Sequence, residues 1–300
     1  MKKQYSQKRT TNASSSLIEY YYLTKPGIVR GNLLTVATGF LLASNGSVDL
    51  RRLLAVLFAS SLVLASGCVF NNVLDRQIDS KMSRTKARAV VGGRVEIRSA
   101  LIFATVLFFG GIGLIVAFVN SLVAFLGVFG VVFYVLVYGY FKRTSVHGTL
   151  IGSISGAIPP VIGYTSVTSS LDIACLSIFM ILVCWQMPHF YAIAIFRAKD
   201  YKAASIPVLP LVKGVDATKR QMILYLFMFV PVCLSIWLQG YVGVVYGLIM
   251  AIAGIYWLMV GLRGWHNMDS VKWSQQIFTT SLIILPVWLI AVGLDGFITS

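Results

Sequence analysis

Long hydrophobic runs separated by short polar stretches cover most of this sequence. Crossing the ~30 Å hydrocarbon core of a bilayer takes about 20 helical residues, because each residue adds ~1.5 Å. Apolar runs of that length predict nine transmembrane helices, at residues 27–44, 51–71, 99–119, 121–141, 148–166, 171–195, 221–239, 241–262 and 275–294. The pattern therefore predicts an all-α polytopic membrane protein. No linker divides the chain, so we expect residues 1–300 to form a single integral-membrane domain that begins with a polar tail, 1–16.

The composition agrees with this class. Hydrophobic residues make up 57% of the chain and charged residues only 12%, against roughly 25% charged residues in soluble domains. These values exclude a soluble domain, a disordered chain and a coiled coil. The four cysteines all fall inside apolar runs, so we expect small buried side chains rather than disulfides or metal ligands. No apolar stretch precedes Leu17, so a cleaved signal peptide is not expected.

The positive charge has an uneven distribution that predicts the orientation. The net charge is +15, and 23 of the 25 Lys and Arg residues fall in the N-terminal segment and in alternate loops; Arg51 and Arg52 are the exceptions. Cytoplasmic loops of membrane proteins are enriched in Lys and Arg. We therefore expect a cytoplasmic N-terminus and, after nine spans, a periplasmic C-terminus. Basic loops on one side of a bilayer require no nucleic acid partner, and none is expected.

The first cluster of candidate functional residues follows the second hydrophobic run. Asn71, Asp75 and Asp79 are spaced i, i+4, i+8, which would stack three oxygen-bearing side chains over ~12 Å of one helix face. Asn72 lies beside the same stripe. Such hard oxygen ligands suit Mg²⁺, which leaves its other positions to water and substrate phosphate. Basic residues follow the carboxylates, as expected where a metal and a polyanion share a site: Lys81, Arg84, Lys86 and Arg88. The alternative is a solvated loop whose acids pair with its bases.

A second cluster lies in and after the sixth run. Trp185 and His189 are four residues apart, on one face of a predicted transmembrane helix. A His inside a membrane span is a candidate general base, haem ligand or donor to a carboxylate. The alternative is a structural hydrogen bond to a neighbouring helix. Beyond this helix, Asp200 lies next to Lys199 and would form a second acidic pole of the same site.

The fifth run begins with a close-packing pattern. Glycines at 148, 152 and 156 are spaced four apart, and Pro159-Pro160 follows them. This spacing is typical of closely packed membrane helices, and the prolines predict a break. Lys142, Arg143 and His147 precede this run and are candidate anion contacts, with cytoplasmic charge bias as the alternative.

At these motifs the sequence resembles the UbiA-type intramembrane prenyltransferases. The resemblance lies in the N-x-x-x-D-x-x-x-D stretch from Asn71 to Asp79 and in the basic run from Lys81 to Lys86. It narrows to the protoheme IX farnesyltransferase (haem O synthase) subfamily through Trp185–Tyr191 and through Asp200-Tyr201, which leads to Ile206-Pro207-Val208-Leu209-Pro210. Lys25-Pro26, Gly156–Gly163 and Lys142-Arg143-Thr144 are also similar to that subfamily.

The resemblance implies a fold and a reaction. It implies nine helices around a central cavity that opens toward the cytoplasm, in the bacterial inner membrane. Mg²⁺ would connect the acidic motifs to farnesyl diphosphate. The farnesyl group would pass to a vinyl group of protohaem IX (haem B), giving haem O for a terminal oxidase, with haem A synthase or oxidase assembly proteins as partners.

The resemblance also assigns roles to individual residues. The catalytic residues would be Asp75, Asp79, Asp200 and His189, and the metal ligands would be Asn71, Asp75, Asp79 and Asp200. The diphosphate-binding set is Asn72, Arg84, Lys86, Lys142, Arg143 and Lys199, and the haem-binding pair is Trp185 and His189. Two positions depart from the pattern of the superfamily: Ala204 replaces the last acid of the second motif, and His147 stands where a polar residue such as Asn is expected near Gly148.

Two other functions remain open at this point. The first is a UbiA-type enzyme that prenylates an aromatic quinone precursor, although Trp185–Tyr191 argues against it. The second is a transporter of an anionic lipid, in which the charged residues bind but catalyse nothing.

Overall fold

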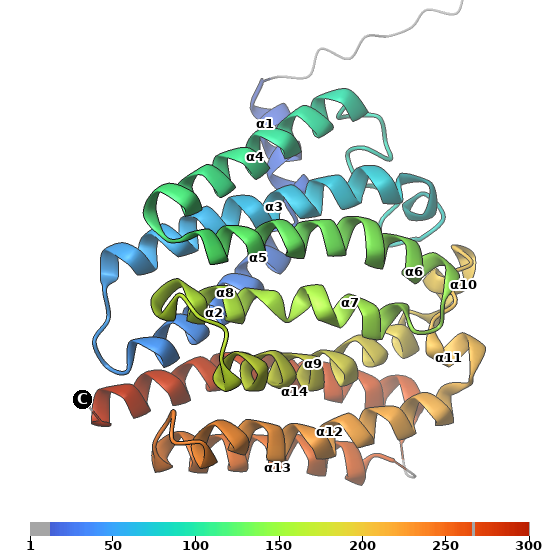
Figure 1. Ribbon diagram of the computed structural model, residues 1–300. Helices are drawn as coiled ribbons and strands as arrows, with labels where there is room; N and C mark the ends of the chain where they lie inside the picture. Colours follow the sequence, from blue (N-terminus) through green and yellow to red (C-terminus); the bar gives the residue numbers. More distant parts are fainter. Residues whose placement is uncertain (1–12, 266–267, 300) are drawn as a thin grey trace, which may run out of the picture.

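The computed structural model describes residues 13–265 and 268–299, and all regular structure in these ranges is helical (Figure 1). The elements are α1 (Ala13–Leu23), α2 (Pro26–Ser44), α3 (Leu50–Asp79), α4 (Ile97–Phe118), α5 (Ser121–Val132), the π-helical turn η1 (Phe133–Tyr138), α6 (Gly139–Thr144), α7 (Gly148–Gly156), α8 (Ile158–Thr168), α9 (Ile173–Phe196), α10 (Ala198–Ala203), α11 (Leu209–Val212), α12 (Val215–Leu238), α13 (Val244–Arg263) and α14 (Ser270–Thr299).

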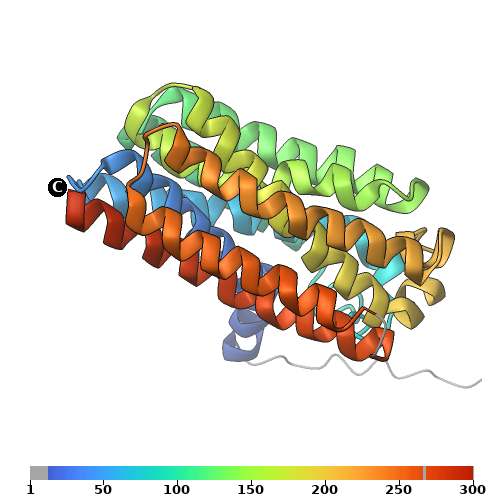
Figure 2. The same cartoon turned by 90° about the horizontal axis from the view of Figure 1, so that it is seen from below.

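The prediction of nine membrane-spanning helices is confirmed for the described residues. Seven spans are single helices: α2, α3, α4, α9, α12, α13 and α14. The fourth span combines α5, η1 and α6, and the fifth combines α7 and α8. Figure 2 shows them side by side in one elongated bundle.

Some helices are longer than the hydrophobic runs that predicted them. The second span runs on to Asp79 instead of ending near residue 71, the seventh begins at Val215, and the ninth begins at Ser270. Hydropathy marks the residues that lie in hydrocarbon, whereas backbone hydrogen bonding continues into the interface. The first acidic motif therefore lies on a helix and not in a loop.

The predicted break in the fifth span is confirmed. α7 ends at Gly156, and α8 begins at Ile158 with Pro159 in its first turn, where a missing N–H costs nothing. α8 packs tightly against α2, because a Cβ at Gly39 would lie 1.9 Å from the Pro160 carbonyl oxygen, and one at Gly163 would lie 1.9 Å from that of Val36. Small residues thus allow these two helix backbones to touch.

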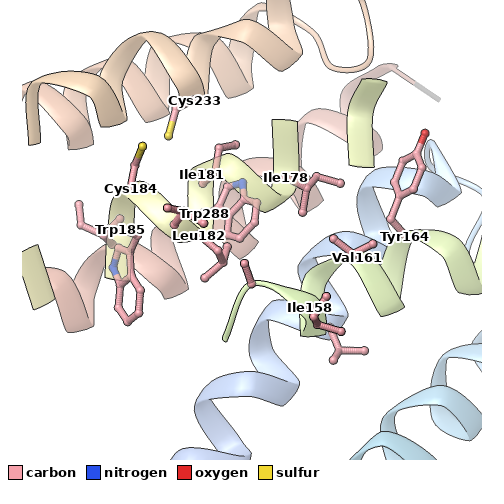
Figure 3. Packing of buried hydrophobic residues seen from close by; sticks show 14 of the residues in the cluster. Ile158, Val161, Tyr164, Ile178, Ile181, Leu182, Cys184, Trp185, Cys233 and Trp288 are labelled. Atoms are coloured by element: carbon pink, nitrogen blue, oxygen red, sulfur yellow. The ribbon is translucent and has the colours of Figure 1, made fainter. Parts of the chain in front are cut away.

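The main hydrophobic core surrounds α9, which has the largest buried share of any candidate span in the described residues. In Figure 3, Cys184 of α9 points toward Cys233 of α12, whereas Trp185 points away from that helix. All four cysteines are buried and unbridged, as the sequence predicted.

The two ends of the bundle differ. α10, α11 and the segment 80–96 gather where α3 ends, on the right of Figure 1, and the C-terminal end of α14 lies at the opposite end. α2 begins beside the last turns of α3, where Lys25 contacts Asn71, so the first span begins toward the first of these ends and the last span ends at the other, as nine spans require. Of the predicted polar tail 1–16, residues 1–12 lie outside the described residues and residues 13–16 begin α1.

Candidate active site

The first acidic motif occupies the last turns of α3. Asn71, Asp75 and Asp79 are 3%, 6% and 2% exposed, so the stripe predicted from their spacing faces the interior of the bundle. Asn72 is buried beside them, and Leu74 on the outer face is exposed. Buried carboxylates are costly unless they are paired with cations or bind a metal. Their partners therefore indicate what this site can bind.

Asp75 pairs with two basic residues from the fourth span. Lys142 Nζ donates to Asp75 Oδ2, and the Arg143 guanidinium donates to Asp75 Oδ1 at 3.0 Å. Arg143 also donates to the carbonyl oxygen of Leu74 at 2.8 Å. Lys142 further lies over the ring of Tyr138, 5.3 Å from its centroid. The structure thus brings both predicted bases of this span onto the first motif.

Glycines in α7 hold the fourth span in this position. A Cβ at Gly148 would lie 2.7 Å from the Lys142 Cα, and one at Gly152 would lie 2.7 Å from the Tyr138 ring. The π-helical turn η1 ends at Tyr138, immediately before α6 with its two bases. Such turns are rare and occur frequently at functional sites. The predicted close-packing face is confirmed, and it sets the position of Lys142.

Asp79 is held by the segment that follows α3. Arg88 Nη1 donates to Asp79 Oδ2 at 2.5 Å, and the Thr85 hydroxyl donates to the Asp79 carbonyl oxygen at 3.0 Å. The segment thus folds back over the end of its own helix. Arg88 was noted in the sequence only as one of several bases, and its ion pair makes it a stronger candidate than Arg84 or Lys86, which are both exposed.

The same segment connects the two acidic motifs. The backbone N–H and the hydroxyl of Ser83 donate to Asp200 Oδ1, at 2.9 and 2.6 Å. The hydroxyl hydrogen bond is the main cause of the lowered pKa of the Asp200 carboxyl. Asp200 lies at the start of α10, with Lys199 exposed next to it. Both motifs therefore lie at one end of the bundle, because only three residues of chain separate Asp79 from Ser83.

The carboxylates of the two motifs do not form a single preformed set of metal ligands in the described residues. Within residues 13–265 and 268–299, no three His, Cys, Asp or Glu side chains form a group that could hold a metal ion. The physical reason is that cations, not other carboxylates, occupy the space next to Asp75 and Asp79. Any ion bound here would take a few protein oxygens and complete its shell with water or with phosphate oxygens.

Two amide atoms at the site lack partners. Asn72 donates through Nδ2 to the Leu23 carbonyl oxygen at 2.8 Å, but its Oδ1 is buried without a partner, as is Nδ2 of Asn71. Leaving a buried polar atom unpaired costs about 1–3 kcal/mol. Unpaired amide atoms beside two carboxylates suit a site that binds a ligand. The carboxylate and amide oxygens of these residues are hard donors of the kind that Mg²⁺ prefers.

Lys25 is a further residue of this site, outside the set predicted from the sequence. It caps the start of α2 in the left-handed conformation (φ 52°), and its Nζ donates to Asn71 Oδ1 at 2.9 Å. Burial lowers the pKa of this ammonium to about 8. A signal for Lys25 is present in the sequence, because Lys25-Pro26 stands directly before the first span, but a lysine at that position also fits the cytoplasmic bias of positive charge.

The second predicted pair lies deeper in the bundle, between α9 and α14. The His189 and Trp185 rings stack with centroids 4.7 Å apart. The Trp185 Nε1–H donates to the carbonyl oxygen of Ser281, and His189 Nδ1 lies 2.7 Å from the Ser281 hydroxyl oxygen. His189 therefore does make the hydrogen bond to a neighbouring helix that a purely structural role would require. This hydrogen bond uses Nδ1, one of the two ring nitrogens.

A family model and individual relatives match this chain. The model described as the UbiA prenyltransferase family matches residues 32–283. Protoheme IX farnesyltransferase 2 of Pseudomonas fluorescens (strain Pf0-1) is 47% identical over 281 residues, which is 93% of this chain and 95% of that protein. Protoheme IX farnesyltransferase of Pseudomonas syringae pv. syringae (strain B728a) is 46% identical over 286 residues, 95% of this chain and 97% of that protein.

Solved structures share the fold at lower identity. A structure of digeranylgeranylglyceryl phosphate synthase matches with a TM-score of 0.77 and 18% identity, covering 94% of this chain and 99% of that chain. A UbiA homologue from Archaeoglobus fulgidus bound to GPP and Mg²⁺ matches with a TM-score of 0.66 and 14% identity, covering 91% and 99%. At such identities the likeness concerns the fold alone.

Proposed function

Because this chain belongs to the UbiA prenyltransferase family, we propose that it transfers the farnesyl group of farnesyl diphosphate to a vinyl group of protohaem IX. The bond between farnesyl C1 and the diphosphate oxygen breaks, and the vinyl group supplies the electron pair for the new C–C bond. Water then adds to the resulting cation and loses a proton. The products are haem O, diphosphate and one proton.

The observation that carries this proposal is the arrangement of charge around α3. Buried Asp75 and Asp79 face Lys142, Arg143 and Arg88 at the end of the bundle. A metal diphosphate carries both signs of charge. Its metal ion can bind the carboxylates, and its phosphate oxygens can replace the carboxylates as partners of the three cations. Lys25 and the unpaired amides add polar groups that a diphosphate can use.

Mg²⁺ fits the oxygen donors at this site, which would come from Asn71, Asp75, Asp79 and Asp200. A bound Mg²⁺ would supply neutralising charge for the leaving diphosphate. The chain's own cations would add to this charge: Lys142, Arg143 and Arg88, which pair with the buried carboxylates, would neutralise the negative charge that develops on the leaving diphosphate. Asn72, Arg84, Lys86 and Lys199 complete the proposed diphosphate-binding set. The Archaeoglobus homologue bound to GPP and Mg²⁺ supports the same pairing of ligands.

The haem would bind between the diphosphate site and the deeper part of α9. His189 and Trp185 are its proposed contacts, and basic residues at the end of the bundle would pair with its propionates. The relatives at 46–47% identity are both protoheme IX farnesyltransferases, which supports haem over an aromatic quinone precursor. They support an enzyme over a transporter in the same way.

We place the protein in the bacterial inner membrane, with a cytoplasmic N-terminus and a periplasmic C-terminus. The end that carries the acidic motifs then faces the cytoplasm, the side on which a water-soluble diphosphate is released. Haem A synthase or the assembly proteins of a terminal oxidase are the proposed recipients of the product.

The pigment content of membranes tests this function. Haem is extracted from membranes of cells with and without the protein, separated, and identified by mass. The proposal predicts a haem that carries a hydroxyethylfarnesyl group only where the protein is present. Membranes that contain the same haems in both cases would refute it.

A further inference from the structure

Ser281 of α14 meets both residues of the deeper pair on α9. Its carbonyl oxygen accepts the Trp185 Nε1–H at 2.9 Å, and its hydroxyl oxygen lies 2.7 Å from His189 Nδ1. Ser281 is fully buried, and His189 is 9% exposed. One residue of the last span therefore sets the position of two neighbouring rings on the sixth span.

The proton on the Ser281 hydroxyl is already committed. Its Oγ lies 2.5 Å from the carbonyl oxygen of Phe278, one turn earlier on α14. A carbonyl carries no proton, and two oxygens at this distance repel unless a proton lies between them. A serine hydroxyl has a single proton. The contact with His189 must therefore use a proton from Nδ1, which donates to Ser281 Oγ.

This proton count fixes the tautomer of His189. The groups that face its ring are the aromatic rings of Trp185, Phe190 and Phe278 and the Ser281 hydroxyl, with no carboxylate among these described contacts. An uncompensated imidazolium is costly in such surroundings, so the ring is neutral. A neutral imidazole with its proton on Nδ1 carries a free lone pair on Nε2.

The contacts leave that lone pair open. Trp185 stacks on the imidazole at a centroid distance of 4.7 Å, Phe278 lies tilted against it at 4.8 Å, and Phe190 meets it edge-on at 5.2 Å. Nδ1 faces Ser281. Among the described contacts the imidazole hydrogen-bonds only through Nδ1, and Nε2 is absent from the buried side-chain atoms that lack a partner, so this nitrogen is not fully enclosed. One ring nitrogen thus donates a hydrogen bond and the other carries an available lone pair. This arrangement is typical of a histidine that ligates a metal and is oriented by its second ring nitrogen.

We propose that His189 is an axial ligand to the iron of the haem substrate, through Nε2, and that Ser281 is the positioning residue that keeps this lone pair available. The inference rests on the proposed function for the identity of the ligand. An imidazole nitrogen is a common ligand of haem iron. His189 lies seven residues before the end of α9, about 10 Å along the helix axis.

Haem binding without farnesyl diphosphate tests the inference directly. The full-length protein in detergent is titrated with haem B, and the bound haem is followed by its Soret absorbance and by resonance Raman spectroscopy. His189→Ala should lose the iron–nitrogen signature, and added imidazole should restore it. Ser281→Ala should keep the ligand but shift the iron–nitrogen stretch and weaken haem binding about three- to tenfold, the effect of one lost hydrogen bond. Ser281→Thr should restore wild-type behaviour.

The same helix offers a matched control. Ser274 is also fully buried on α14, and its hydroxyl donates to the carbonyl oxygen three residues earlier, at 2.8 Å. It has no contact with His189, so Ser274→Ala should leave the spectrum and the affinity unchanged. A wild-type iron spectrum in His189→Ala would overturn the ligand assignment. A Ser281→Ala protein indistinguishable from Ser274→Ala would overturn the positioning role.

A product assay separates this inference from the proposed function. If the wild-type protein binds haem through His189 but never farnesylates it, the proposed reaction fails and the ligand assignment stands. If His189→Ala farnesylates haem at the wild-type rate with an unchanged iron spectrum, the ligand assignment fails and the reaction stands.

Discussion

Asp75 is the most densely paired carboxylate of the acidic motifs. It is 6% exposed and meets Lys142 and Arg143. A single carboxylate does not balance two cations, so this group of three side chains keeps a net positive charge beside Asp79 and Arg88. Such a site attracts an anion of high charge, such as a diphosphate. The Asp75 carboxylate can then bind the metal ion that accompanies the diphosphate.

Replacing Asp75 with Asn should abolish most of the activity. An amide can neither bind Mg²⁺ as a carboxylate does nor hold the Lys142 and Arg143 side chains by charge. We expect turnover, measured as diphosphate release, to fall at least about 100-fold, as when one preorganised electrostatic group is lost. Asp49→Asn is the control, because Asp49 caps the other end of α3 and Asn caps equally well. Wild-type turnover in Asp75→Asn would refute the assigned role.

Lys25 should act on substrate binding. In Lys25→Gln the cation next to Asn71 is lost, so we expect the KM for farnesyl diphosphate to rise about tenfold, the worth of one charge-assisted hydrogen bond. Lys25→Arg keeps the charge and should recover most of the affinity.

Arg30 provides a nearby control for Lys25. It is exposed on the same span and donates to the Pro26 carbonyl oxygen. Arg30→Gln should leave the KM unchanged. Equal KM values for Lys25→Gln and the wild type would exclude Lys25 from the diphosphate site.

At the residue scale the sequence predicted which side chains belong to the site better than it predicted which of them contact one another. The spacing of Asn71, Asp75 and Asp79 was sufficient to place them on one face, because helical periodicity is local. The pairing of Asp75 with Lys142 joins residues 67 positions apart, and the contact of Ser83 with Asp200 joins residues 117 apart. Such contacts depend on how whole helices pack, which no local pattern encodes.

At the scale of elements, α2 and α8 pack backbone against backbone. A Cβ at Gly163 would lie 1.9 Å from the Val36 carbonyl oxygen, and backbone atoms cannot move aside as a side chain can. We expect Gly163→Ala to lower the unfolding free energy by about 1–3 kcal/mol, the usual cost of overpacking. The thermal unfolding midpoint in detergent measures this loss.

The matched control for Gly163 lies in α4. A Cβ at Gly113 would meet nothing within 4 Å, so Gly113→Ala should leave the midpoint unchanged or raise it. An equal midpoint for Gly163→Ala and Gly113→Ala would mean that the two helix backbones are not in contact.

The sequence predicted the spans but not their internal geometry. Hydropathy located all nine, and Pro159-Pro160 predicted the break in the fifth. The π-helical turn from Phe133 to Tyr138 left no signal, because the residues there are as apolar as their neighbours. The helical course of residues 71–79 was expected only if the second span continued, and it does continue.

At the scale of the whole molecule, one end of the bundle carries both acidic motifs and their cations. The opposite end carries the exposed turn after α2 and the C-terminal end of α14. This polarity matches the bias of Lys and Arg in the sequence. The orientation proposed from it can be tested without touching the site.

Thiol labelling tests the orientation. The four native cysteines are buried, so the background should be low. Ala87 and Ser47 are exposed at opposite ends of the bundle. A membrane-impermeant maleimide should label Ser47→Cys in intact spheroplasts and Ala87→Cys only after lysis. The reverse pattern would invert the topology and place the acidic motifs outside the cytoplasm.

The reaction catalysed by the purified protein tests the central claim most directly. The protein is incubated in detergent with farnesyl diphosphate, haem B and Mg²⁺, and the porphyrin product is identified by mass spectrometry. The account predicts a haem that has gained one farnesyl group and one water, with one diphosphate released for each haem converted. Unchanged haem with intact farnesyl diphosphate, or farnesylation of an added aromatic acid in place of haem, would contradict it.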